Sequence, residues 1–226
     1  MTVEALHEDA DLLVLCKPPG VLCVPGRGPD KQDALSTRAQ QRWPGALIVH
    51  RLDQATSGLV LMARHPEAQR RLGDAFAQRQ IAKRYHAIVA GRLGAPDGAW
   101  HTIDLPIAAD WPRRPLRVID PVNGKPSQTR WRALAHDQAS DTTHVELEPI
   151  TGRTHQLRVH LSAVGHPILG DALYGDDATR QRAPRLLLHA SGLAFAHPAT
   201  GAAMAFEWPA DFLMVKMASS AWRPQI

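Results

Sequence analysis

The segment "HRLDQATSGLVLMAR", His50–Arg64, joins a polar turn to an apolar run. Its second half, residues 58–64, is rich in large aliphatic side chains, which is typical of a buried strand. Asp53 precedes the turn and lies two residues after Arg51. In extended backbone these two side chains point to the same face. An acid at the mouth of a strand suggests a catalytic carboxylate, although a structural ion pair gives the same pattern.

Further strands are expected on both sides of this segment. Apolar runs bounded by turn residues predict them over 11–17, 84–91, 130–135 and 144–150, with a late hairpin from 185–198 to 202–208. In residues 144–150, Val145 and Leu147 alternate with two glutamates, Glu146 and Glu148. This alternation predicts that one face of the strand is solvated.

Three helices are expected, over residues 33–43, 66–80 and 151–165. Asp33 is a candidate cap for the first helix and Pro66 suits the first turn of the second. In the second helix, Leu72, Ala75 and Phe76 form the predicted inner stripe. In the third, Thr151 or Thr154 is a candidate cap, Leu157, Leu161 and Val164 form the apolar stripe, and Gly165 is the stop signal.

Residues 91–126 are rich in Pro and Gly and predict long surface loops. Strands and helices do not alternate strictly, so a doubly wound fold is not expected. The sequence predicts an α+β fold with a mixed, mainly antiparallel sheet and flanking helices. Its length of 226 residues suits one large domain, or one domain with a small appendage.

Composition bounds the class of protein. Hydrophobic residues make up 44% and charged residues 21%, which is typical of a globular domain. The N-terminus does not resemble a signal peptide, and no apolar run approaches the roughly 20 residues of a membrane span. Cys16 and Cys23 lack zinc-ribbon spacing, and the twelve histidines are scattered. We therefore expect a cytoplasmic protein with two reduced thiols, no metal and no membrane contact.

Lys and Arg total 26 against 22 Asp and Glu, a formal net charge of +4. Arginine greatly outnumbers lysine, and its planar fork suits phosphate and base contacts. The exposed loops add candidate contacts for a polyanion: Arg27, Trp111, Arg113, Arg114, Arg117 and Lys125. Each alone is ordinary surface, but together they favour a nucleic-acid partner.

Two further segments hold candidate site residues. Tyr85 follows two basic residues and opens a strand, where its ring could stack on a base or simply pack in a sheet. Arg158 lies beside Leu157, which faces the core, and a partly buried arginine needs an anionic partner such as Asp53. A solvated helix arginine is the simpler interpretation of that segment alone.

Taken together, "CKPPG", "HRLDQATSG", "KRYHAIVAG", "TGRTHQLRVHLSAVGHPILGDALYG" and "RLLLHA" resemble the RluA-type family of pseudouridine synthases, over about residues 10–210. The segments "VPGR", "DWPRRP" and "GKPSQT" resemble its branch with dual specificity for 23S ribosomal RNA and transfer RNA. The resemblance implies the pseudouridine synthase fold with a central catalytic cleft. The isomerisation needs no redox step or hydrolytic water, so we expect no cofactor; because bases unstack easily in RNA loops, we expect stem-loops as partner, and we expect a monomer. We expect one catalytic domain over residues 1–226, without an N-terminal RNA-binding module of the S4 type.

The resemblance also implies roles for individual residues. Asp53 would be the essential catalytic aspartate, Tyr85 would stack on the target base and later transfer a proton, and Arg158 would pair with Asp53. Arg51 would enter the RNA stack where the uridine has left. The RNA-binding set would contain these further residues: His50, Arg27, Trp111, Arg113, Arg114, Lys125, Arg153, and Leu187 or Leu188 as the pocket floor.

Three alternatives remain open at this point. The enzyme could act on transfer RNA only, or the chain could be a non-catalytic RNA-binding protein of the same fold. An RNA glycosylase or glycoside hydrolase is the third alternative, but such enzymes usually place two carboxylates at the bond. The key segments offer one, Asp53.

Overall fold

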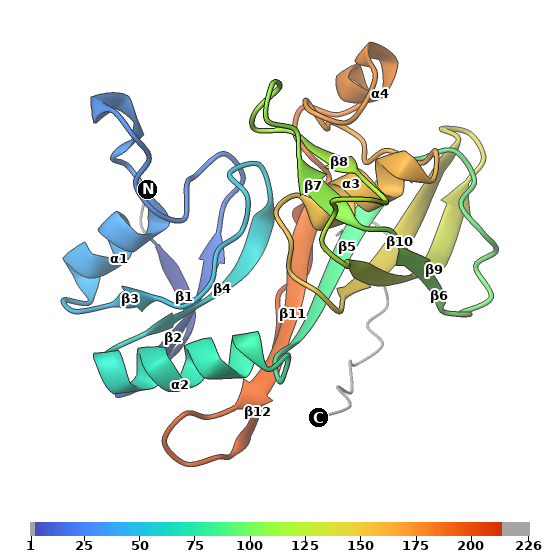
Figure 1. Ribbon diagram of the computed structural model, residues 1–226. Helices are drawn as coiled ribbons and strands as arrows, with labels where there is room; N and C mark the ends of the chain where they lie inside the picture. The colour runs from blue at the N-terminus through green and yellow to red at the C-terminus, as the bar shows by residue number, and fades with distance from the viewer. Residues whose placement is uncertain (1–2, 214–226) are drawn as a thin grey trace. The chain divides into compact units, whose positions relative to one another are not determined.

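The computed structural model describes residues 3–213 of the chain. Its contacts divide the chain into two compact units. Unit 1 contains the chain up to Lys83 and again from His189, and unit 2 contains Arg84–Leu188. Each unit has its own strands and helices (Figure 1).

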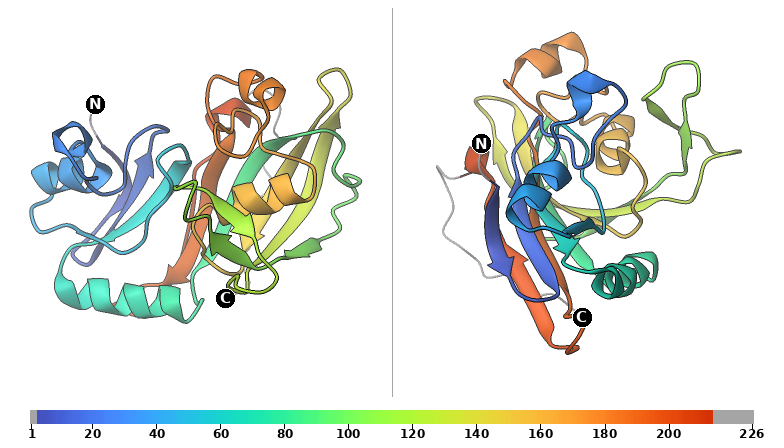
Figure 2. Two further views of the ribbon diagram at one scale, coloured as in Figure 1. Left: turned by 45° about the horizontal axis from the view of Figure 1, so that its top comes forward. Right: turned by 90° about the vertical axis from the view of Figure 1, so that its left-hand side faces the viewer.

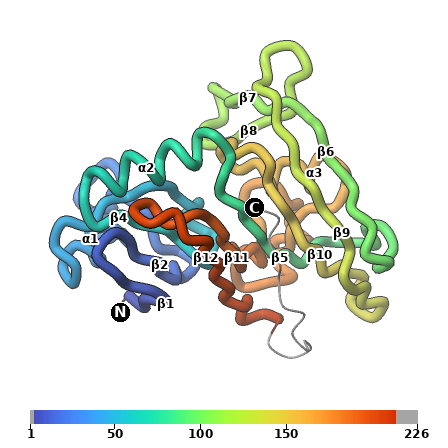
Figure 3. The backbone as a smooth tube through the Cα atoms, turned by 90° about the horizontal axis from the view of Figure 1, so that it is seen from below, coloured from blue at the N-terminus to red at the C-terminus, as the bar shows by residue number. Residues whose placement is uncertain are grey.

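Unit 1 is built on a mixed sheet. Its strands follow the order β1 (Glu4–Glu8), β2 (Leu12–Lys17), β4 (Ser57–Ala63) and β11 (Leu188–Ala196), with β3 (Leu47–Ile48) paired to β4 and β12 (Ala203–Glu207) paired to β11. The β4–β11 pair is parallel, and the other pairs of unit 1 are antiparallel. Figure 3 follows the chain reversal from β11 into β12.

The apolar core of unit 1 lies between this sheet and α2 (Pro66–Ala77), which lies beside the sheet (Figure 1). Leu72 of α2 is 1% exposed and packs in a cluster with Leu12, Leu61 and Phe195. Ala75 and Phe76 pack against the same cluster, which confirms the predicted stripe. Each fully buried leucine of this kind contributes about 1.5–3 kcal/mol through burial. Two further helical segments are α1 (Leu35–Arg42) and the short η1 (Pro29–Lys31).

Unit 2 is an antiparallel sheet with the order β5 (Ala82–Ala90), β10 (Thr142–Pro149), β9 (Gln128–Asp137) and β6 (His101–Asp104). A separate two-stranded hairpin is formed by β7 (Ile107–Ala109) and β8 (Arg117–Ile119). Helix α3 (Gln156–Ala163) packs against β8, β9 and β10, so the hairpin lies beside α3 (Figure 2). The remaining helical segments are α4 (Asp177–Gln181) and, in unit 1, η2 (Asp211–Leu213).

The predicted fold class is confirmed: the fold is α+β, the strand pairing is mainly antiparallel and the helices are few. The predicted strands correspond to β2, β4, β5, β9, β10 and the β11–β12 hairpin. The prediction of long loops over residues 91–126 was wrong in part, because β6, β7 and β8 lie there. These strands have three or four residues each, too short for an alternating pattern to stand out among the prolines and glycines.

The predicted solvated face of β10 was also wrong at one position. Glu146 is 3% exposed, because its carboxylate lies between two arginines of neighbouring strands. It forms ion pairs of 3.0 Å with Arg84 Nε and 2.8 Å with Arg132 Nη2. The alternation therefore predicts correctly that this face of β10 is polar. Glu146 on this face is nevertheless buried, because the two arginines cover its carboxylate.

The helix boundaries differ from the predicted caps. The N-cap of α1 is Ala34, and Asp33 instead forms a salt bridge with Arg38. The N-cap of α3 is His155, in the left-handed region with φ of 57°, rather than Thr151 or Thr154. Local sequence favours Ser, Thr and Asp at caps. At the start of α1, however, the N–H groups of Leu35 and Ser36 donate to the carbonyls of Leu22 and Cys23.

Val164 does not complete the apolar stripe of α3, since it is 38% exposed, whereas Leu161 is fully buried. Val164 instead ends the helix as its C-cap. Gly165 follows with φ of +87°, as expected of a stop signal. Within residues 3–213, no helix is long and apolar enough to cross a membrane.

Candidate active site

Asp53 lies in unit 1, in the turn that connects β3 to β4. The N–H of Thr56 donates to the carbonyl of Asp53 at 3.1 Å and closes this turn. Leu52 is buried and its N–H donates to the thiol of Cys23 at 3.1 Å, whereas Arg51 is exposed. Local anchoring on both sides therefore fixes the backbone that carries Asp53.

Lys17 fastens the same turn to the end of β2. Its side chain is fully buried, and Nζ donates to the carbonyls of Pro18, Val21 and Gln54 at 3.0, 2.8 and 3.0 Å. Burial lowers the pKa of Lys17 to about 8, and the carboxylate of Asp53 is among the charges that oppose this shift. The sequence analysis did not identify Lys17 as a site residue. A lysine that ends an apolar strand just before "PPG" was the available signal.

The entrance to β4 requires a glycine. Gly58 has φ of +116°, and a Cβ there would lie 2.3 Å from the carbonyl oxygen of Ala190 on β11. Beside it, Ser57 Oγ lies 2.9 Å from His189 Nδ1, and His189 Nε2 lies 3.0 Å from the carbonyl of Trp208. A carbonyl only accepts, so Nε2 carries a proton, and in the neutral ring Nδ1 accepts from the Ser57 hydroxyl. The parallel β4–β11 pair is thus locked directly after the Asp53 turn.

His50 is held inside unit 1. The N–H of Leu61 donates to His50 Nε2 at 2.9 Å, and the ring stacks on Phe76 with centroids 4.5 Å apart. Burial and the nearby charge of Lys83 lower the pKa of His50 to about 3. His50 is therefore a neutral acceptor that ties the approach to Asp53 onto β4.

Acid should destabilise the protein through His50. Between pH 6.5 and about 3 the unfolded imidazole binds a proton that the folded one does not, so stability falls as pH falls through this window. We expect the wild type to lose about 2–2.5 kcal/mol more than His50→Gln between pH 7 and 4.5. Urea unfolding of both proteins at the two pH values measures the difference, and parallel losses would contradict the assignment.

Tyr85 lies in unit 2, on β5, where it pairs with Leu147 of β10 and is half-buried. Leu187 donates its N–H to the carbonyl of Leu169 at 3.0 Å, and its carbonyl accepts the N–H of Ile88 at 3.2 Å. Leu188 is 3% exposed. Leu187 is half-buried.

Arg158 is 4% exposed, so the interpretation as a solvated helix arginine was wrong. Its Nε and Nη2 donate to the two carboxylate oxygens of Asp171 at 2.8 and 2.6 Å. The Asp171 side chain is fully buried, and its Oδ1 also accepts the N–H groups of Leu173 and Tyr174. Such a paired, bidentate geometry fixes the guanidinium rigidly. Asp171 was missed in the sequence, where only "GDALYG" after the predicted helix marked it.

The start of α3 is fixed by a buried polar network. Gln156 is 3% exposed and its Nε2 donates to the carbonyl of Gln128 at 2.9 Å, while its Oε1 accepts from Thr151 Oγ1 at 2.7 Å. Arg153 is exposed and donates its N–H to the same Oε1 at 3.0 Å. The network leaves the Arg153 side chain at the surface of unit 2.

Four of the predicted RNA contacts lie on or next to the β7–β8 hairpin. Trp111 is 67% exposed, and the guanidinium of Arg114 lies over its ring at 4.1 Å. Arg113 donates Nε to Asp110 Oδ2 at 2.7 Å, and this contact holds the tip of the hairpin. Lys125 is exposed, and its backbone pairs with Ile107 of β7. The two remaining loop candidates are Arg117, which lies on β8 and is half-buried, and Arg27, which is exposed in unit 1.

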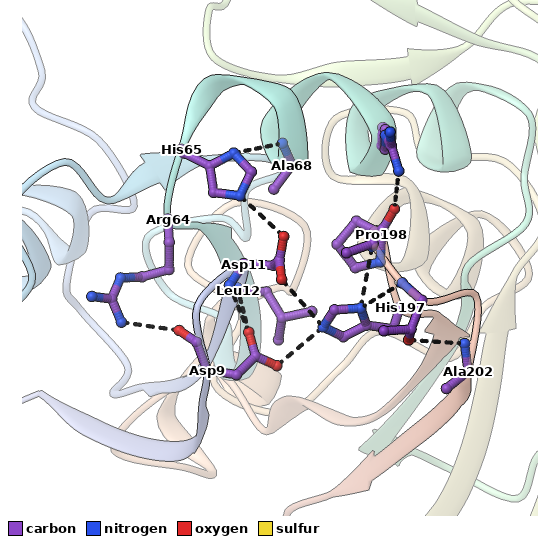
Figure 4. A network of polar contacts seen from close by, with 12 residues as sticks. Asp9, Asp11, Leu12, Arg64, His65, Ala68, His197, Pro198 and Ala202 are labelled. Atoms are coloured by element: carbon purple, nitrogen blue, oxygen red, sulfur yellow. Dashed lines mark hydrogen bonds and ion pairs between the residues drawn. The ribbon is translucent and has the colours of Figure 1, made fainter.

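One cluster in the described chain brings ligand-type atoms within 4.8 Å of one another, namely Asp9, Asp11 and His197 (Figure 4). The N–H groups of Ala199 and Thr200 both lie 3.2 Å from His197 Nδ1, so this nitrogen is an acceptor. The neutral ring then carries its proton on Nε2, which donates to Asp9 Oδ2 at 3.2 Å.

His65 repeats this arrangement beside the cluster. Its Nδ1 accepts the N–H of Ala68 at 3.3 Å, and its Nε2 donates to Asp11 Oδ1 at 3.0 Å (Figure 4). A metal would need the lone pair of the nitrogen that faces the carboxylates. The backbone donors on the other nitrogen oppose that state, so we interpret the cluster as a hydrogen-bonded network that links β2, α2 and the β11–β12 hairpin.

Comparison with known proteins decides the family. Residues 11–163 match the family described as RNA pseudouridylate synthase, and this range includes Asp53, Tyr85 and Arg158. The chain belongs to this family. It is therefore an RNA uridine isomerase, with RNA as its partner, and the predicted resemblance is confirmed.

Relatives in this family match the chain over nearly its whole length. The dual-specificity RNA pseudouridine synthase RluA of Escherichia coli strain K12 is 46% identical over 207 residues, 92% of this chain and 93% of that protein. The corresponding protein of Haemophilus ducreyi is 42% identical over 210 residues, covering 93% of this chain and 94% of its own. The structure of human RNA pseudouridylate synthase domain containing 1 is 32% identical, with a TM-score of 0.77, and the match covers 94% of this chain and 85% of that one.

Proposed function

We propose that the pseudouridine synthase reaction of this chain depends on Asp53 as its one catalytic carboxylate, and that its substrates are stem-loops of 23S ribosomal RNA and transfer RNA. The main support is the position of Asp53, in a turn that the buried Lys17 anchors, within the family-matching part of the chain. The printed name of the Escherichia coli relative, which includes dual specificity, supports the choice of substrates.

The reaction needs little machinery. The bond between N1 of uracil and C1′ of ribose breaks, the base rotates, and a bond forms between C5 and C1′. N1 gains a proton and C5 loses one, so the isomerisation needs no oxidant, reductant or hydrolytic water. Asp53 attacks C1′ or C6, or removes the 2′ proton, and each of the three routes requires the ionised carboxylate.

The other residues receive roles around the reacting base. A stacked uridine must leave the RNA helix before it reacts, at a cost of a few kcal/mol. Arg51 is exposed beside Asp53, and its planar guanidinium suits the space left in the stack. Tyr85 stacks on the extruded base and moves the proton at C5, and Leu187 or Leu188 floors the pocket. Arg158 is the cation assigned to Asp53, and its bond to Asp171 presets its orientation.

The β7–β8 hairpin supplies the RNA contacts. Trp111 offers an exposed ring and Arg114 an exposed charge above it. An aromatic ring with a guanidinium suits the unpaired bases and the phosphates of an RNA loop. Arg27, Arg113, Lys125 and Arg153 extend this positive surface in our proposal. We propose that the chain acts as a monomer on such loops.

Arg114→Ala should weaken RNA binding. It should also reduce the magnitude of the slope of log affinity against log salt concentration by about one. The reason is that one phosphate contact, and the counterion it releases, is lost. Fluorescence anisotropy with a labelled stem-loop over a salt series measures the slope. Arg70→Ala, at an exposed arginine of α2, is the matched control. An unchanged slope in Arg114→Ala would remove the hairpin from the interface.

Two experiments separate the alternatives. Ribosomal RNA and transfer RNA incubated with the pure protein show whether both gain pseudouridine or transfer RNA alone. Chromatography of the same reactions detects free uracil, which a glycosylase would release and an isomerase would not. Formation of pseudouridine without uracil supports the proposal, whereas an unmodified RNA that still binds would support a non-catalytic binding protein.

A further inference from the structure

Tyr174 lies in the loop between α3 and α4 and connects three elements of unit 2. Its hydroxyl accepts the backbone N–H of Arg117, on β8, at 2.9 Å. The same hydroxyl lies 2.7 Å from His155 Nδ1, at the start of α3. Tyr174 thus joins the hairpin to α3 through one oxygen atom.

The direction of these bonds follows from the donors. The Arg117 N–H can only donate, so the hydroxyl oxygen accepts there and its own proton is available for His155 Nδ1. His155 meets this proton because its backbone takes the left-handed conformation, with φ of 57°. Histidine, like asparagine and aspartate, is enriched in that region among residues other than glycine. The contact with Tyr174 therefore forms at a backbone conformation that histidine tolerates.

The ring of Tyr174 serves a second contact. The guanidinium of Arg158 lies 5.1 Å from the ring centroid, within cation–π distance. The N–H of Tyr174 donates to Asp171 Oδ1 at 3.2 Å, and this oxygen also accepts from Arg158. One carboxylate therefore positions both the tyrosine and the arginine.

The hairpin is also attached through the backbone pairing of Ile107 with Lys125 and through the packing of β8 against α3. Its strands β7 and β8 have three residues each, and a two-stranded hairpin of that size is marginally stable by itself. The Arg117 N–H donates to the Tyr174 hydroxyl. This hydrogen bond connects the hairpin to the loop that follows α3. Loss of this bond should loosen the hairpin more than it loosens the rest of unit 2.

We propose that Tyr174 is a positioning residue that holds the RNA-binding hairpin in a fixed orientation against the helix that carries Arg158. The RNA part of this inference rests on the proposed function, because Trp111 and Arg114 must be contacts of the substrate. Tyr174 itself acts through the hairpin and through Arg158, without touching the reacting atoms.

The test uses Tyr174→Phe in the full chain, which removes the hydroxyl and keeps the ring. Hydrogen exchange of the Arg117 amide, followed by NMR on the free protein, should accelerate about tenfold, because one hydrogen bond is lost. The dissociation constant for a labelled stem-loop should rise about 5–10-fold. Ser140→Ala is the matched control, since it removes a hydroxyl bonded to Asp137 at the β9–β10 turn. It should change neither quantity.

A double-mutant cycle gives the decisive readout. If Tyr174 acts through the hairpin, Tyr174→Phe should add little to the loss of RNA affinity already caused by Arg114→Ala. Fully additive effects, or an unchanged Arg117 exchange rate, would overturn the proposal. Should Tyr174→Phe lose cooperative unfolding, His155→Gln is the second variant for the same cycle. If Arg117 exchange is faster in Tyr174→Phe but the wild-type protein does not modify RNA, the structural role of Tyr174 is retained and the proposed function is rejected.

Discussion

Asp53→Asn should abolish pseudouridine formation while the protein keeps its fold and most of its RNA affinity. The amide cannot act as a nucleophile or base, so the rate should fall at least about 10²–10⁴-fold, the range that a positioned acid–base group contributes. The turn should survive, because it is held by backbone and Lys17 contacts that do not use the Asp53 carboxylate.

Tritium release from C5 of labelled uridine in a stem-loop measures this rate under single-turnover conditions. Asp74→Asn is the matched control, since Asp74 is an exposed acid on α2. Circular dichroism and anisotropy establish that both variants fold and bind RNA. Tritium release by Asp53→Asn at close to the wild-type rate would reject Asp53 as the catalytic group.

Asp171→Asn should destabilise the protein by about 3–5 kcal/mol, the usual cost of leaving one partner of a buried ion pair alone. Asp171 is fully buried and Arg158 is 4% exposed, so water cannot replace the lost charge. Asparagine keeps the size of the side chain and an oxygen for the N–H groups of Leu173 and Tyr174. The expected loss therefore comes from removing the negative charge of Asp171 from beside the buried guanidinium.

Urea unfolding at pH 7 gives the free energies of unfolding for this comparison. The control is Asp177→Asn, whose partner Arg180 lies 2.9 Å away but whose carboxylate is 83% exposed. That exposed pair should contribute less than about 1 kcal/mol. Equal effects of the two substitutions would show that the buried pair does not have the importance we give it.

The elements that could be predicted from sequence are those whose signal is local. Residues of β2, β4 and α2 all pack in the same apolar core. Each of these elements has a hydrophobic pattern of its own in the sequence, so its position and its type, strand or helix, were predicted correctly. The β6 strand was missed because it is set by pairing with β9, about 30 residues away in the sequence, and β7 and β8 were missed because the paired strands have only three residues each. Short strands of this kind have almost no pattern of their own.

The site shows the same limit. That a buried Arg158 needs an acid could be argued from the chain, but the choice of Asp171 depends on the path of the loop after α3. Likewise, Lys17 looks like an ordinary lysine at the end of a strand in the sequence. Only the structure shows that its Nζ donates to three backbone carbonyls. Glu146 was expected in solvent because its two arginines lie on other strands. The types of residue at the site could be predicted, whereas their partners could not.

The most direct test of the central claim is pseudouridine mapping on unmodified 23S ribosomal RNA and transfer RNA. Each RNA is incubated with pure wild-type protein or with Asp53→Asn, and the modified nucleotides are located by mass spectrometry. We predict pseudouridine at defined stem-loop positions in both RNAs with the wild type and at none with the variant. Unmodified RNA after incubation with the wild type, or equal modification by the variant, would contradict the account.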